Sequence, residues 1–110
     1  MDYIRVGSFV EVPEGELRAY ELPSGRVAVA HVEQRLFAVG DECPHAGCSL
    51  AEEGTLSDAE DAVSCDNDGS TFDLETGEPI DGPASDPIRV FPVRVQDGWI
   101  EIGGDAREER

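Results

Sequence analysis

Short stretches in which apolar and polar residues alternate run through most of the chain, with turn residues roughly every eight to twelve positions. No stretch keeps the 3.6-residue period of an amphipathic helix. We therefore expect a small all-β fold of antiparallel strands, and 110 residues are enough for one domain with one modest core. The predicted strands cover residues 3–6, 17–22, 26–32, 36–39, 63–64, 71–74, 89–95 and 99–102.

The connections between these strands are predicted from turn chemistry. Asp97-Gly98 is typical of a tight hairpin turn in which both residues take a positive φ. Two longer segments, residues 41–49 and 75–87, are rich in glycine, proline and acidic residues and are expected to form loops. The charged segment 103–110 has no apolar anchor, and we expect a disordered tail there.

The charge of the chain limits its partners. Twenty-five Asp and Glu residues against eight Arg and no Lys give a formal net charge of −17. Nucleic acids and anionic membranes attract clustered basic residues, so the sequence predicts neither as a partner. A protein with a basic docking surface fits the charge better; the alternative is that the acidity serves only solubility or life in high salt.

The sequence also bears on location. No run approaches the roughly 20 apolar residues of a membrane helix, and the N-terminus lacks the charged and apolar regions of a signal peptide. Three cysteines, an odd number, fit poorly with a disulfide-stapled secreted domain. We expect a soluble, cytoplasmic protein whose cysteines bind a metal or remain free.

One six-residue segment, Cys43-Pro44-His45-Ala46-Gly47-Cys48, holds two of the three cysteines and one of the two histidines. The third cysteine, Cys65, is separated from His45 by nineteen residues. Thiolate and imidazole together suit zinc or an iron–sulfur cluster. Two loops that project from neighbouring hairpins of a β scaffold could bring these side chains to one centre, so we expect a metal site here.

The segments Cys43-x-His45 and Cys65-x-x-Asp68-Gly69-Ser70 together resemble the two cluster loops of Rieske-type [2Fe–2S] ferredoxins, whose pattern is Cys-x-His followed by Cys-x-x-His. The likeness continues in residues 72–77, 82–84 and 91–95. It implies an all-β, Rieske-type antiparallel sandwich or barrel. It also implies a single domain over residues 1–102, with a small inserted cluster-binding subdomain over about residues 41–82.

The resemblance further implies a ligand set. In this family two cysteines hold one iron and two histidines hold the other, which assigns Cys43 and Cys65 to the first iron and His45 to the second. Asp68 stands where the second histidine is expected, and the only other histidine, His31, is expected to be an ordinary strand residue. A carboxylate in place of a neutral imidazole makes the cluster more negative. Its potential should therefore fall below the two-histidine range of about −150 to +300 mV.

The residue at position 68 leaves three outcomes open. In the first, Asp68 supplies a carboxylate oxygen and the [2Fe–2S] cluster is retained. In the second, the cluster is lost and the Rieske fold serves as a non-redox binding or assembly module. In the third, Cys48 becomes the missing ligand, around either a cluster or a structural zinc. If Cys48 is not a ligand, we expect it to be a small buried filler, because Asn67 stands where high-potential Rieske domains have its disulfide partner.

With the cluster retained, the resemblance implies a ferredoxin that carries one electron from a reductase to a non-haem iron oxygenase, such as a ring-hydroxylating dioxygenase. No paired base and nucleophile form a recognisable catalytic motif, so the chain itself is not expected to be an enzyme. Ser70 matches a position from which a hydroxyl can hydrogen-bond the cluster, and Gly69 would allow close backbone approach. Gly82-Pro83-Ala84 resembles the loop that covers the cluster.

Overall fold

The structure, a computed structural model, describes residues 3–22, 25–41, 49–57, 61–65, 69–82 and 86–103. Every strand pair in these residues is antiparallel, which confirms the all-β prediction. The elements are β1 (Tyr3–Ser8), η1 (Phe9–Glu11), β2 (Leu17–Leu22), β3 (Gly25–Val32), β4 (Arg35–Gly40), α1 (Leu50–Glu53), β5 (Gly54–Ser57), β6 (Ala62–Cys65), β7 (Thr71–Asp73), β8 (Pro79–Asp81), β9 (Val90–Phe91), β10 (Val93–Gln96) and β11 (Trp99–Gly103).

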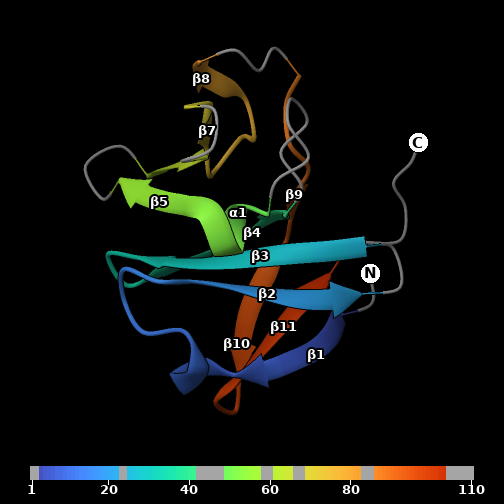
Figure 1. Cartoon of the computed structure of the whole chain (residues 1–110). Coiled ribbons are helices and arrows are strands. Elements are labelled where there is room, and N and C mark those ends of the chain that lie inside the picture. Colours follow the sequence, from blue (N-terminus) through green and yellow to red (C-terminus); the bar gives the residue numbers. More distant parts are fainter. Residues whose placement is uncertain are drawn as a thin grey trace.

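The strands form three sheets arranged as layers (Figure 1). The middle sheet has the strand order β2-β3-β4-β9, and the sheet β1-β11-β10 lies below it in the view. The third sheet, β5-β6-β7-β8, lies above it together with α1. Since β4 and β9 pair with each other, the segment that carries β5 to β8 is an insertion between two neighbouring strands of the middle sheet.

Strand β3 holds the layers together because both of its faces are apolar. Val27 and Val29 belong to the core shared with β11 of the lower sheet. Ala28, Ala30 and Val32 belong to the core shared with β6 and β7 of the upper sheet. None of the five is more than 1% exposed. Successive strand residues point to opposite faces, so a strand with apolar residues on both faces lies between two cores. The expectation of a single core is therefore wrong.

Most of the predicted strands are confirmed, with small changes at their ends. The prediction of one strand over residues 89–95 is wrong. This segment contains β9, which pairs with β4 in the middle sheet, and β10, which pairs with β11 in the lower sheet. Pro92 lies between them, and because proline has no N–H it cannot continue a hydrogen-bonded ladder. The chain therefore changes sheets at Pro92.

The sequence prediction missed β5, β8 and α1. Strand β8 lies inside the predicted loop 75–87 and contains Pro79 and Asp81, two residue types that are rare in strands. Helix α1 has one turn, and the Ser49 hydroxyl oxygen accepts a hydrogen bond from the Glu52 N–H at 3.3 Å. The pattern Ser49-x-x-Glu52 is a known signal for the start of a helix.

The C-terminal hairpin agrees with the sequence. Asp97 and Gly98 have φ values of 55° and 82°, which confirms the turn. Gly103, predicted as the start of a disordered tail, is instead the last residue of β11 and pairs with Tyr3. Residues 104–110 lie outside the described residues. None of the helices in the described segments is long and apolar enough to cross a membrane.

Candidate metal centre

The predicted first ligand loop, residues 42–48, lies outside the described residues, but its two ends are described and meet at Asp41. Asp41 follows β4 and is 2% exposed. The Ser49 hydroxyl donates to Asp41 Oδ2 at 2.6 Å, and the Ala51 N–H donates to Asp41 Oδ1 at 2.8 Å. The backbone carbonyl of Asp41 accepts the Leu50 N–H at 2.7 Å. The residues that flank the loop are therefore fixed to each other, and we call this hydrogen-bonded junction the closed base of the first loop.

Arg26 of β3 compensates the buried charge of Asp41. The Arg26 Nε lies 3.4 Å from Asp41 Oδ2, and its Nη2 donates to Glu52 of α1 at 2.9 Å. The Asp41 N–H also donates to the Arg26 carbonyl at 3.0 Å. A carboxylate is costly to bury unless it is both paired and hydrogen-bonded, and Asp41 meets both conditions.

Residues 66–68 of the predicted second ligand loop lie outside the described residues. The residues that flank them, Cys65, Gly69 and Ser70, form a second closed base between β6 and β7. The Cys65 N–H donates to the Ser70 carbonyl and the Gly69 N–H donates to the Cys65 carbonyl, both at 2.7 Å. Gly69 has a φ of 82°, in the left-handed region that glycine adopts without strain. The positive φ is a local reason for glycine at this position, and close backbone approach to a cluster stays a prediction.

Gly82 begins the third predicted segment and packs against this second base. A Cβ at Gly82 would lie 2.5 Å from the Ser70 Cα and 2.6 Å from the Gly69 carbonyl oxygen. Only glycine allows the two stretches of backbone to approach this closely. That residues 82–84 cover the cluster stays a prediction, and Pro83 and Ala84 lie outside the described residues.

Of the four predicted ligands, Cys65 lies in the described part of the chain. Its side chain is fully buried, and its sulfur is disulfide-bonded, whereas cluster ligation requires the thiolate. The other predicted ligands, Cys43, His45 and Asp68, lie outside the described residues, as does Cys48. Within the described segments, no three His, Cys, Asp or Glu side chains are grouped so that they could hold a metal ion.

His31 is confirmed as a strand residue with the contacts of a core histidine. Its side chain lies on the same face of β3 as Val29, and the residue is 8% exposed. Its Nδ1 is 2.8 Å from the carbonyl oxygen of Val12, and its ring lies 5.2 Å from that of Phe9. These contacts attach the segment after β1 to the middle sheet.

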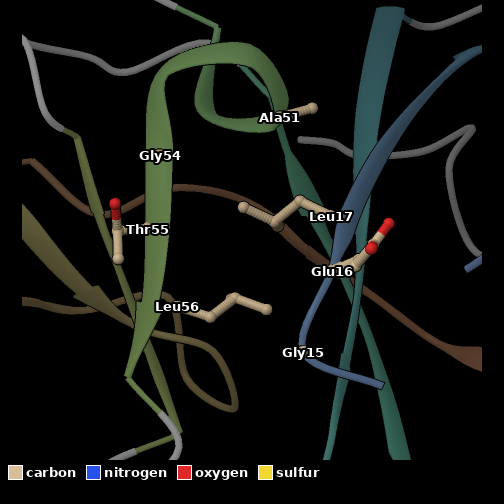
Figure 2. Close-up of a pocket in the computed structure, with 7 residues that line it drawn as sticks. All are labelled: Gly15, Glu16, Leu17, Ala51, Gly54, Thr55 and Leu56. Carbon is tan, nitrogen blue, oxygen red and sulfur yellow. The ribbon is translucent and has the colours of Figure 1, made fainter. Parts of the chain in front are cut away.

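A pocket of about 380 Å³ borders α1, between the start of β2 and strand β5 (Figure 2). Leu17 and Leu56 point toward each other across it, and Ala51 lies at its rim. Glu16 is the one charged residue among its described lining residues, and no cysteine or histidine is among them. This lining offers no donor set for a metal, but it leaves α1 open on this side.

The sequence analysis assigned no role to Asp41 or Arg26. One signal was present: Asp41 directly follows an apolar strand and precedes, by eight residues, the serine of the helix-start pattern Ser49-x-x-Glu52. An acid in that position can close a loop by accepting N–H and O–H groups from its far end. No local pattern pointed to Arg26.

Comparison with known proteins identifies the family to which these loops belong. The family model for the Rieske [2Fe-2S] domain matches residues 2–92, a range that includes both closed loop bases and Gly82. The chain belongs to the Rieske [2Fe-2S] domain family. In this Rieske domain, the predicted second loop and the third segment both belong to the inserted sheet β5–β8.

Individual relatives of this Rieske domain are ferredoxins. The 3-phenylpropionate/cinnamic acid dioxygenase ferredoxin subunit of Photorhabdus laumondii is 36% identical over 102 residues, which cover 93% of this chain and 94% of that protein. The ferredoxin component of the p-cumate 2,3-dioxygenase system of Pseudomonas putida is 38% identical over 93 residues, which cover 84% and 77%. A chain from the complex of reduced oxygenase and oxidised ferredoxin in carbazole 1,9a-dioxygenase has a TM-score of 0.84, 30% identity and 97% coverage of both chains.

The family implies a [2Fe–2S] cluster, and the described residues fit one. Cys65 is fully buried at the end of β6, and its sulfur, which is disulfide-bonded in this structure, would have to be reduced to the thiolate to bind iron. Ser70, also fully buried, follows on the far side of the same loop base. Leu50 and Cys65 belong to one hydrophobic core, so both loops rest on the same rigid support. A cluster held by two loops needs such a fixed relation between them.

Proposed function

We propose that this Rieske domain is the ferredoxin of a dioxygenase-type system, which takes one electron from a reductase and passes it to a non-haem iron oxygenase. When bound, the [2Fe–2S] cluster supplies a one-electron redox couple. The observation that carries the proposal is the pair of closed loop bases on one core, in a chain that matches the Rieske domain over residues 2–92. Substrate chemistry belongs to the oxygenase, and the chain itself is an electron carrier rather than an enzyme.

The proposed ligands are Cys43 and Cys65 for one iron, and His45 and Asp68 for the other. Burial of Cys65 at the end of β6 supports its assignment. For the other three, support comes from their places in the two loops, whose flanking residues are fixed by Asp41 and by the Cys65 base. The Asp68 carboxylate adds negative charge, which disfavours uptake of an electron and lowers the potential of the centre.

The proposed partners are an oxygenase and a ferredoxin reductase. The relatives are ferredoxin components of dioxygenases, and one similar chain comes from a complex with its oxygenase, which supports the first partner. We propose basic docking surfaces on both partners, since opposite charges steer association. In the described part of the chain, all six arginines already lie beside a carboxylate or over an aromatic ring. Few positive charges are therefore left without a partner on the described surface to oppose the acidic residues. A cytoplasmic location remains a prediction.

We also propose that residues 41–82 form one cluster-binding subdomain within a single domain of residues 1–102. The insertion of the β5–β8 sheet between the neighbouring strands β4 and β9 supports this division. Asp41 lies at one boundary and Gly82 at the other, and each contacts one of the loop bases.

Purification without oxygen tests the proposed function. We expect a coloured protein with absorbance between about 400 and 600 nm and about two irons per chain, which bleaches reversibly on reduction. Iron-free, colourless protein would contradict the carrier and favour a non-redox module. About one zinc per chain without iron would instead favour a structural site.

The substitution Asp68→His tests the proposed fourth ligand. We expect the variant to keep its cluster and to have a higher potential, because a neutral imidazole replaces a carboxylate on the iron. Asn67→His adds a histidine to the same loop at a position without a proposed ligand role and should leave the potential near that of wild type. Unchanged spectrum and potential in Asp68→His would show that Asp68 does not bind iron. Loss of colour in Cys48→Ser would show that Cys48 is the ligand instead.

A further inference from the structure

Asp41 makes three hydrogen bonds across the first ligand loop. Both carboxylate oxygens and the backbone carbonyl accept hydrogen bonds from the three consecutive residues 49–51 after the loop, at 2.6–2.8 Å. Its N–H is bound to the Arg26 carbonyl of the neighbouring strand. The residue two positions before Cys43 is therefore held in place through its side chain, its carbonyl and its N–H.

The charges around Asp41 connect the loop to the middle sheet. Arg26 of β3 lies between Asp41 and Glu52, with 3.4 Å from its Nε to Asp41 and 2.9 Å from its Nη2 to Glu52. The Asp41 side chain is 3% exposed and that of Arg26 is 39% exposed, so the carboxylate is the buried partner of this ion pair. Loss of Arg26 would leave the buried Asp41 carboxylate without its counter-ion.

Helix α1, at the far end of the loop, is short and borders a pocket on one side. The helix has four residues, too few to be stable by itself, and the pocket of Figure 2 lies along one side of it. Leu50 is buried in the upper core, while Ala51, whose N–H binds Asp41, is partly exposed at the pocket rim. The Asp41 carboxylate is thus a polar anchor of this helix, beside the contact from Arg26 to Glu52.

We propose that Asp41, with Arg26 as its counter-ion, is the positioning residue of the loop that carries Cys43 and His45, and that it controls how firmly the cluster is retained. This inference rests on the proposed function. Partners that orient metal ligands without touching the metal change metal affinity about 10- to 100-fold when they are removed. Asp41 and Arg26 act through the loop and have no proposed contact with iron.

The test compares cluster retention in wild type, Asp41→Ala, Ser49→Ala and Glu101→Gln. Glu101 is the matched control, because it is also a buried carboxylate with two guanidinium neighbours, Arg5 and Arg94, but it lies in β11 of the lower sheet. Loss of visible absorbance to an iron chelator is followed well below the unfolding temperature. We expect Asp41→Ala to lose its cluster about 10- to 100-fold faster than wild type, Ser49→Ala to be intermediate, and Glu101→Gln to keep the wild-type rate.

A second readout separates positioning from general stability. The electron paramagnetic resonance line shape of the reduced cluster should shift in Ser49→Ala and Asp41→Ala and stay unchanged in Glu101→Gln. If Asp41→Ala does not fold, Ser49→Ala, which removes one contact at Oδ2, carries both measurements. This inference would be overturned if the Asp41 and Ser49 variants kept wild-type release rates and line shapes, or if Glu101→Gln released its cluster equally fast. Either result would leave the proposed electron-carrier function standing. Wild-type protein without iron would overturn both.

Discussion

At the scale of single residues, the site depends on backbone contacts that glycine alone permits. Gly82 touches the base of the second loop, and a Cβ there would lie 2.5 Å from the Ser70 Cα. Gly77, before β8, packs at least as closely, since a Cβ there would overlap the Ile88 carbonyl oxygen and lie 2.9 Å from the Val90 Cγ2. Both have positive φ values, 90° and 81°. These two glycines hold the inserted sheet close to the second loop and to β9.

The substitution Gly82→Ala should destabilise the protein by about 2–4 kcal/mol, because it combines a strained positive φ with backbone overlap at the second loop. Gly15→Ala is the matched control, with a φ of 88° and nothing within 4 Å of the added Cβ. It should cost only about 1 kcal/mol. Urea unfolding measures both. Equal losses in the two variants would show that the Gly82 contact does not restrain the loop.

Residue patterns predicted part of the site. The spacing of Cys43, His45 and Cys65 was sufficient to predict a metal centre, because ligands must be close in sequence or on facing loops. Closure of the first loop by Asp41 was not predictable in the same way. That closure joins residues eight to ten positions apart and relies on Arg26 from another strand, so no local period records it.

At the scale of elements, β11 holds the lower sheet together because it pairs with both β1 and β10. Glu101 in this strand is 7% exposed and accepts hydrogen bonds from Arg94 at 2.8 Å and Arg5 at 3.2 Å. The guanidinium of Arg94, followed by that of Arg5, holds the pKa of Glu101 below its ordinary value of 4.5. One side chain thus links all three strands of the sheet.

Glu101→Gln should lower the free energy of unfolding at neutral pH. Since the folded-state pKa is depressed, the contribution of Glu101 is present above about pH 4.5 and is lost as the pH falls through the lowered pKa. The difference between wild type and variant should therefore shrink as the pH is lowered. Urea unfolding across a pH series measures it. Glu21→Gln, at an exposed position in β2, should show no such difference. A difference that is constant with pH would contradict the role of the ion pairs.

The elements that the sequence predicted are those stabilised by apolar alternation. Strand β3 is predicted from its sequence without ambiguity, because its apolar side chains fill both cores. Strand β8 is a three-residue edge strand with a proline, and its pairing with β7 depends on tertiary placement rather than on its own residue preferences. Pro92 did not predict the change of sheets, because apolar and polar residues continue to alternate on both sides of it.

At the scale of the whole molecule, two layers of strands lie beneath the inserted sheet β5-β6-β7-β8 (Figure 1). The predicted second ligand loop falls between β6 and β7 of this sheet. Two cores meet on opposite faces of β3, so the support beneath the loops is continuous with the rest of the fold. The net charge of the chain, −17, fits the basic docking surfaces proposed for its partners. The resemblance to Rieske ferredoxins predicted the all-β antiparallel fold, and the composition restricted the partners that we expect.

The most direct test of the central claim is electron paramagnetic resonance of anaerobically purified protein, before and after one-electron reduction. A [2Fe–2S] carrier should be silent when oxidised. On reduction it should show one species that integrates to about one spin per two irons and disappears on reoxidation. Iron-containing protein without this signal, or protein that carries zinc and no iron, would contradict the account.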